Sequence, residues 1–246
     1  MKKETTAELI VAAVVLLAAP ALMGSTIVLN LDPVNYTAKP GGEYNAQTVG
    51  LVGGQTPSQI LAGYDSLAKA VVGGSTGFQT FCLEESEGFT PGKSYQVVAN
   101  DRAVAGGANL FHPVVTPGAD ILSVGTTWLY SQFAQGTLPG YTYVWGAGRV
   151  ASAKALQATI WWLEDAAADP GALNTFRNAV VGSFVNPKLD AAPGLDGVHA
   201  LNLTLRDGTL KQDVLIYQTP EGGVTVTLLG FGLAAIGVFG LRVKQD

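Results

Sequence analysis

The chain contains a single cysteine and two histidines among its 246 residues. One cysteine cannot close a disulfide within its own chain, and a zinc site would need a cluster of Cys and His ligands. Only 13% of the residues are charged and the net charge is −5, so nothing supports nucleic-acid binding. No Gly-rich phosphate-binding motif of a standard spacing occurs. We therefore expect no metal and no cofactor. Cys82 remains as a free thiol, a partner in an intermolecular bridge, or a residue with another covalent fate.

The N-terminus has the pattern of a secretory signal peptide. Lys2 and Lys3 precede an apolar run over residues 9–17, and small residues with Pro20 follow up to Ser25. This order of a basic start, a short apolar core and small residues predicts a signal peptide over residues 1–25. The alternative is an uncleaved N-terminal membrane anchor.

The C-terminus carries a second apolar run, over residues 224–241, which Arg242 and Lys244 follow. Its length predicts a transmembrane helix, and the basic end predicts that the main domain faces outward. The motif Pro220-Glu221-Gly222-Gly223 precedes it. Motif, apolar run and basic end together resemble the PEP-CTERM class of sorting signals, although Thr219 stands where that class usually has valine. The resemblance implies that an exosortase-type enzyme recognises and cleaves residues 219–246. The simpler alternative is a plain membrane anchor.

The remaining residues 26–218 are enough for one domain with its own core. The chain's 31 glycines and 12 prolines suit a turn-rich extracellular domain that contains β-structure. Alternation predicts strands at 26–31, 44–51, 77–85, 94–99, 197–205 and 211–217. Helical spacing and caps predict helices at 56–71, 123–135, 150–165 and 170–183. We expect an α+β fold, with strands at both ends of the domain (sandwich or barrel-like) and a helical region in the centre.

Two turns predict hairpins between these strands. Thr90-Pro91-Gly92-Lys93 would join strands 77–85 and 94–99, and Asp207-Gly208 would join strands 197–205 and 211–217. In the helix that starts at Pro170, we expect Leu173, Phe176 and Val180 to point inward.

Two short stretches suggest the fate of the thiol. Thr80-Phe81-Cys82-Leu83-Glu84 lies on a predicted strand, and Leu156-Gln157-Ala158-Thr159-Ile160-Trp161 lies on a predicted helix. In this order, with residues 123–133 between them, they resemble the thioester domain of bacterial surface adhesins. Leu83 and Thr159 depart from the residues common there. The resemblance implies that the Cys82 thiol and the Gln157 side chain are joined as an internal thioester.

The chemistry needs these residue types. A thiolate can attack a primary carboxamide and expel ammonia, which leaves an activated acyl group. Water must be kept from this group, and Phe81, Trp161 and Trp162 could form the shield. An amine or hydroxyl of a partner would then be joined to Gln157, and Cys82 would be freed. This is a single attachment, so we do not expect an enzyme in the usual sense.

Ordinary alternatives exist for each of these residues. A lone cysteine is commonly a small buried hydrophobe, and a helical glutamine is commonly solvated. A cysteine hydrolase would need a histidine near Cys82, and His112 and His199 are expected in a loop and a strand. The acidic residues Glu84, Glu85 and Glu87 lack the spacing of a known calcium loop and predict a solvated acidic turn.

We therefore expect an exported bacterial protein, first tethered to the inner membrane through its C-terminal helix and then cell-surface or extracellular. Its expected role is adhesin-like covalent attachment to a surface or matrix ligand that bears an amine or hydroxyl. The alternative is a non-reactive structural protein of the extracellular matrix or biofilm, sorted by the same exosortase.

Overall fold

The computed structural model describes residues 25–31, 41–48, 77–104, 120–144 and 146–218. The predicted signal peptide up to residue 24, the predicted helix at 56–71, His112 and the C-terminal sorting motif with its apolar run lie outside these residues. Ser25, the last residue of the predicted signal peptide, is the first residue of the first strand. Within the described part, no helix is both long enough and apolar enough to cross a membrane.

The main feature is a six-stranded antiparallel sheet in the order β3-β2-β1-β4-β7-β8. Its strands are β1 (Ser25–Leu31), β2 (Tyr44–Thr48), β3 (Gly77–Thr80), β4 (Ser94–Asn100), β7 (Val198–Thr204) and β8 (Val214–Tyr217). A separate pair is formed by β5 (Arg102–Ala103) and β6 (Asp120–Ile121).

The six-stranded sheet is nearly closed, because the segment that follows β3 meets β8, the strand at the other edge. Cys82 forms an isolated antiparallel bridge with Val214. On either side of it, Leu215 N–H donates to Phe81 O (3.2 Å) and Leu83 N–H donates to Asp213 O (2.9 Å). Near-closure pairs backbone groups that an open sheet would leave exposed at its edges. Cys82 therefore lies on the seam of the sheet.

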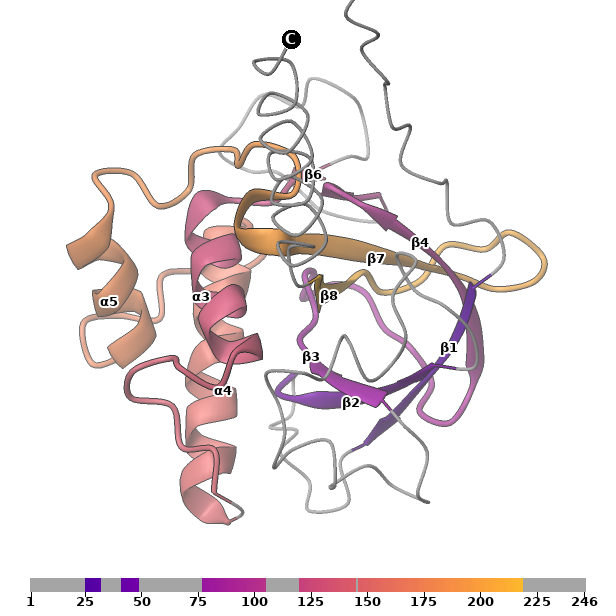
Figure 1. Cartoon of the computed structure of the whole chain (residues 1–246), viewed down its shortest axis with the longest axis horizontal. Coiled ribbons are helices and arrows are strands. Elements are labelled where there is room, and N and C mark those ends of the chain that lie inside the picture. The colour runs from indigo at the N-terminus through magenta and orange to yellow at the C-terminus, as the bar shows by residue number, and fades with distance from the viewer. Residues whose placement is uncertain (1–24, 32–40, 49–76, 105–119, 145, 219–246) are drawn as a thin grey trace, which may run out of the picture.

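Three helices cover one side of this sheet: α3 (Val124–Ala134), α4 (Ala147–Leu163) and α5 (Thr175–Ser183). Figure 1 shows α3 and α4 between the outermost helix α5 and the strands. The short 3₁₀ turn η2 (Leu195–Gly197) leads into β7. Polar side chains cap two helices, since Ser123 Oγ accepts from Thr126 N and Asn174 Oδ1 accepts from Phe176 N and Arg177 N.

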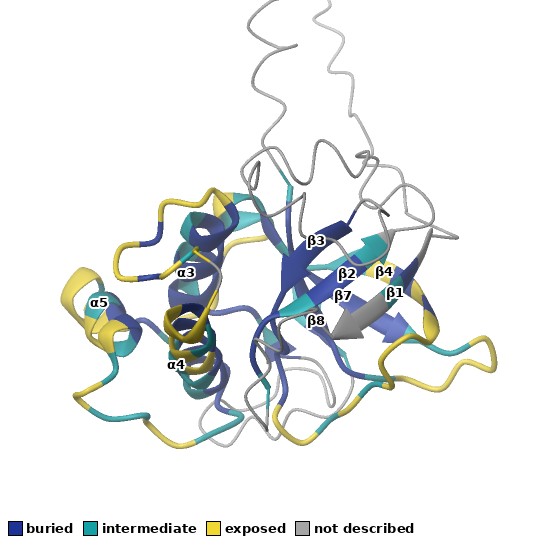
Figure 2. Cartoon of the chain, turned by 90° about the horizontal axis from the view of Figure 1, so that it is seen from below, coloured by how far each residue is buried: buried dark blue, intermediate teal, exposed yellow. Residues whose placement is uncertain are grey.

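The core lies between these helices and the sheet, where Figure 2 shows the facing sides buried. Phe133 of α3 is central: its ring meets the rings of Phe81 (5.0 Å between centroids) and Tyr141 (4.9 Å), both close to perpendicular. Leu156 and Ile160 of α4 pack into the same core and are fully buried. Helix α4 thereby presents one face to the sheet.

The mixed content of helices and strands confirms the coarse fold prediction. The Asp207-Gly208 hairpin is also confirmed, since β7 and β8 are antiparallel neighbours. The other hairpin prediction is wrong, because β3 pairs with β2, whereas β4 pairs with β1 and β7. A local turn signal cannot exclude partners from distant parts of the chain.

Other boundaries differ from the sequence prediction. Strand β3 ends at Thr80, where the chain turns to the β8 edge. Helix α5 starts at Thr175, not Pro170, because Asn174 supplies the cap. Leu173, which precedes that cap, is fully exposed, so its predicted inward position is wrong, whereas Phe176 and Val180 are buried as predicted. Helix α4 begins three residues before the predicted start at Val150.

Candidate functional site

Gln157 lies on the buried face of α4. The helix is rich in alanine, the strongest helix former, and its residues Leu156, Ile160 and Leu163 pack into the core. Gln157 adjoins this stripe and is 1% exposed. Its side chain is therefore not the solvated group that a helical glutamine commonly is. A buried carboxamide must find hydrogen-bond partners inside the protein.

Cys82 supplies two of these partners through its backbone. Gln157 Oε1 accepts from Cys82 N–H (3.1 Å), and Gln157 Nε2 donates to Cys82 O (2.7 Å). In a strand, the N–H and C=O of one residue point to the same side. The neighbours Phe81 and Leu83 use their backbone groups toward β8, so those of Cys82 point to the opposite side. The carboxamide thus pairs with Cys82 as the peptide group of a neighbouring strand would.

A third hydrogen bond reaches the same oxygen from the other side of the site. Gly42 N–H donates to Gln157 Oε1 at 3.4 Å. Two backbone donors on one carbonyl oxygen polarise the C=O bond and stabilise negative charge that develops there, as an oxyanion hole does. The pattern also fixes the orientation of the amide, because two donors face its oxygen and an acceptor faces its nitrogen.

Gly41 allows the chain to pass close to this carboxamide. Its φ is +85°, and a Cβ atom would lie 2.6 Å from Gln157 Cγ and 2.5 Å from Trp161 Cη2. Both contacts are too short for any side chain, and the conformation favours glycine. Glycine at this position is therefore required by the packing of Gln157 and Trp161.

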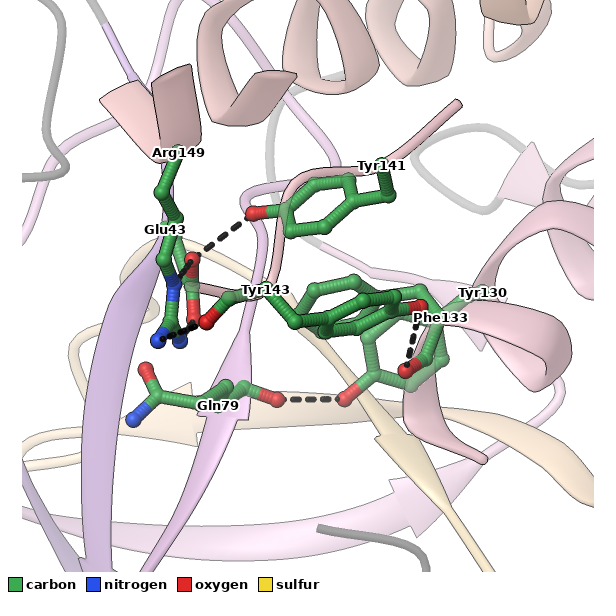
Figure 3. A network of polar contacts seen from close by, with 7 residues as sticks. All are labelled: Glu43, Gln79, Tyr130, Phe133, Tyr141, Tyr143 and Arg149. Carbon is green, nitrogen blue, oxygen red and sulfur yellow. Dashed lines mark hydrogen bonds and ion pairs between the residues drawn. The ribbon is translucent and has the colours of Figure 1, made fainter. Parts of the chain in front are cut away.

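A buried polar network holds the segment that contains these glycines. Glu43 is fully buried and forms an ion pair with the equally buried Arg149 of α4, whose Nε donates to Glu43 Oε2 at 2.9 Å. Tyr141 Oη donates to the same oxygen at 2.7 Å (Figure 3). Burial and the Glu43 charge raise the pKa of Tyr141, so its hydroxyl stays protonated and donates.

Gln79 of β3 extends this network. With its amide nitrogen toward Glu43, it donates to Glu43 Oε1 (3.1 Å) and to Tyr44 O (3.1 Å). Its own backbone oxygen accepts from Tyr130 Oη of α3 (2.8 Å), as Figure 3 shows. The network therefore ties β2 and β3 to α3 and α4, and it holds Gly42 next to Gln157.

A cavity of about 170 Å³ opens beside the cysteine. Cys82 and Trp161 line it together with Tyr44 and Phe89, whose rings meet edge to face at 4.8 Å. Glu85 and Glu87 also line it, and none of the described lining residues is a histidine, lysine or arginine. Access to the cysteine thus runs between aromatic walls and carboxylates.

The Cys82 thiol itself is 4% exposed, and this burial raises its pKa. It is therefore a protonated thiol at neutral pH, unlike the activated thiolate of a cysteine hydrolase. His199 lies elsewhere and contacts Asp101, with 3.2 Å between Nδ1 and Oδ1. Among the described residues, nothing resembles a Cys–His pair.

The aromatic residues expected to shield the site occupy different places. Trp161 lines the cavity, Phe81 is fully buried against Phe133 in the core, and Trp162 lies under Arg177 and Lys188, 5.6 Å and 5.2 Å from its ring centroid. Trp162 is not among the residues that line the cavity.

The predicted acidic turn is not uniformly solvated. Glu84 is 1% exposed, and burial together with the charges of Asp120 and Glu164 raises its pKa to about 9. Glu164 accepts from Ser123 N (3.2 Å) and Ser123 Oγ (2.8 Å). The expectation of a solvated turn is wrong for Glu84 and holds for the exposed Glu85. The described residues contain no group of three or more side chains arranged to hold a metal ion.

Several residues of the site were not identified from the sequence. The sequence predicts no role for Gly41 and Gly42, and Glu43 and Arg149 are far apart in the chain. Arg149 gave no signal of its own, because the predicted helix starts at Val150 and only the structure places Arg149 on α4. Its partner could not be found without the fold.

Comparison of the chain with protein-family models, curated proteins and solved structures found no match.

Proposed function

We propose that this protein is a covalent attachment module, in which Cys82 and Gln157 form an internal thioester that acylates a partner. The observation that carries the proposal is the buried pairing of the Gln157 carboxamide with the backbone of Cys82. The one cysteine of the chain and a glutamine 75 residues downstream meet in a site where the carbonyl oxygen receives two backbone donors.

The bond would form in one exchange. The Cys82 sulfur attacks Gln157 Cδ, and the electron pair of the carbonyl moves onto Oε1, where the N–H groups of Cys82 and Gly42 stabilise it. The C–N bond then breaks, and the departing nitrogen takes the thiol proton and leaves as ammonia. The products are a thioester and one free ammonia molecule.

The second exchange attaches the partner. A nucleophile that enters the cavity beside Cys82 attacks the same carbon, the C–S bond breaks, and the thiol is restored. The partner stays bound to Gln157 through an amide or an ester. Trp161 restricts the approach of water, which would hydrolyse the thioester.

Export places this chemistry where attachment is useful. A signal peptide over residues 1–25 and a PEP-CTERM-type sorting signal over residues 219–246 would deliver the domain, an α+β thioester-like fold, to the outer face of the inner membrane. An exosortase-type enzyme would then release it to the cell surface or matrix. The test is to express the full chain and a chain truncated after Gln218 in a host with and without that enzyme, and to follow processing by mass.

One observation favours the alternative, a non-reactive structural module of the matrix. Burial raises the pKa of the Cys82 thiol, which keeps it protonated and slows any attack by sulfur. In that case the Gln157 pairing simply satisfies a buried carboxamide.

Uptake of methylamine distinguishes the two functions. The thioester predicts that methylamine is incorporated at Gln157, as mapped by peptide mass spectrometry, in the wild type and not in Cys82→Ala. A structural module incorporates none in either protein.

A further inference from the structure

The cavity beside Cys82 has a defined chemical character. Its described lining combines the rings of Tyr44, Phe89 and Trp161 with the carboxylates of Glu85 and Glu87, and it includes no cationic side chain. Aromatic faces and carboxylates both attract cations. A volume of about 170 Å³ equals the volume that about five or six water molecules occupy in the liquid. The space therefore fits the end of an alkylammonium chain.

The two carboxylates differ in their surroundings. Glu85 is exposed, whereas Glu87 is half-buried and its Oε2 makes no hydrogen bond within the described part of the chain. Desolvation strengthens the attraction of a carboxylate for an incoming cation. Glu87 is thus the half-buried carboxylate of the cavity, and one of its oxygens is satisfied by no group in the described part of the chain.

On the basis of the proposed thioester, we propose that Glu87 binds the alkylammonium group of the partner and accepts its proton, which makes the site selective for primary amines over hydroxyls. A lysine-type amine has a pKa of about 10.4, so at pH 7 only about one molecule in 2,500 carries the free electron pair that attack requires. A carboxylate inside the cavity recruits the abundant cationic form and deprotonates it in place. A hydroxyl carries no charge and gains nothing from this attraction.

Glu87 takes one proton from the ammonium ion, and the neutral amine nitrogen attacks Gln157 Cδ. The C–N bond forms, the C–S bond breaks, and the electron pair goes to the Cys82 sulfur. Because burial raises the pKa of this thiol, the sulfur takes up the proton that Glu87 holds. The new amide nitrogen loses its remaining extra proton to water.

The charges around Glu87 suit this role. Burial, then the charge of Asp213, raise the pKa of Glu87 to about 7, and Lys211 opposes the shift. A proton acceptor works best when its pKa lies near the working pH. Glu84, with its pKa raised to about 9, is neutral at pH 7 and does not repel the Glu87 carboxylate. Glu85 lines the cavity as an exposed residue.

The test compares Glu87→Gln with Glu85→Gln, a matched variant that removes a carboxylate from the same cavity. The full chain is purified as it is exported, and the crosslinked fraction is measured first by intact mass. Methylamine uptake is then followed by mass from pH 5 to 9, with glycerol as the hydroxyl probe. We expect uptake to fall at least about 100-fold in Glu87→Gln and to stay within about threefold in Glu85→Gln.

The pH profile gives a second, independent measure. In the wild type, the uptake rate at fixed total methylamine should rise up to about pH 7, as Glu87 ionises, and then level off. In Glu87→Gln the uptake rate should follow the concentration of unprotonated methylamine and rise about tenfold per pH unit throughout. Uptake of glycerol should be slower than that of methylamine and unchanged in both variants.

The outcomes separate this inference from the proposed function. A wild type without the crosslink overturns both. Crosslinked Glu87→Gln that takes up methylamine at the wild-type rate overturns the role of Glu87 and leaves the thioester in place. If Glu87→Gln forms no crosslink, the pH profile of methylamine uptake in the wild type decides. An uptake rate that levels off near pH 7 supports the inference, and an uptake rate that rises about tenfold per pH unit from pH 5 to 9 overturns it.

Discussion

The ion pair between Glu43 and Arg149 gives the sharpest test of how this site is held. Both side chains are fully buried, and Arg149 donates to both carboxylate oxygens of Glu43. Replacing Arg149 with Met keeps much of the side-chain volume and leaves the Glu43 carboxylate without its counter-ion. Removing one partner of a buried pair costs about 3–5 kcal/mol. The remaining hydrogen bond from Tyr141 stabilises the carboxylate in part, so we expect about 3 kcal/mol.

The free energy of unfolding is measured by urea denaturation in a Cys82→Ala background, so that no covalent bond contributes to stability. Arg149→Met and Glu43→Gln should each lower it by about 3 kcal/mol, and the double variant should lose much less than their sum, since no unpaired charge remains. The reasoning would be refuted if each single variant lost less than about 1 kcal/mol of unfolding free energy, or if the loss in the double variant equalled the sum of the two single losses.

The same substitution has a consequence at the site. In the chain that retains Cys82, Arg149→Met should reduce the crosslinked fraction, because Glu43 no longer fixes the neighbouring Gly42 against the carboxamide. Intact mass measures this fraction directly. An unchanged fraction in a destabilised protein would show that the network supports the fold alone.

Three further predictions concern single residues. Glu84 has a folded pKa of about 9 against an ordinary value of 4.5, so the folded state loses stability as pH rises from about 4.5 to 9. At about 1.4 kcal/mol per pKa unit, Glu84→Gln should be more stable than the wild type by about 5 kcal/mol at pH 8 and equal to it near pH 4, as measured by urea denaturation. Gly41→Ala would place a methyl group against Gln157 and Trp161, so we expect a folded protein by circular dichroism with no crosslink by mass, and a normal crosslinked fraction would contradict this. Asn174→Ala removes the cap of α5 and should lower the free energy of unfolding by about 1 kcal/mol without changing the crosslinked fraction.

The parts of this account that the sequence could predict are those with a local physical signal. The cap at Ser123, the Asp207-Gly208 hairpin and the buried stripe of α4 are each determined by residues close together in the chain. The pairing of Cys82 with Gln157 came from the resemblance of their two sequence stretches to the thioester domain of surface adhesins. The structure places the two side by side.

The remaining parts depend on contacts between distant segments. Closure of the sheet at Cys82 requires β8, which lies more than a hundred residues downstream, so a turn after Thr90 could not reveal it. The burial of Glu43 and Glu84 follows from what packs over them, and hydrophobic spacing alone treats both as surface charges. The hydrogen bond from Gly42 N–H to Gln157 Oε1 could not be predicted, for the same reason.

The measurement that tests the central claim most directly is the intact mass of the purified exported chain, beside Cys82→Ala and Gln157→Ala. We expect a wild type lighter than its processed sequence by one ammonia, with neither variant showing that loss. A wild-type mass equal to its sequence, together with one thiol that titrates after unfolding and no amine or water added at Gln157, would contradict it.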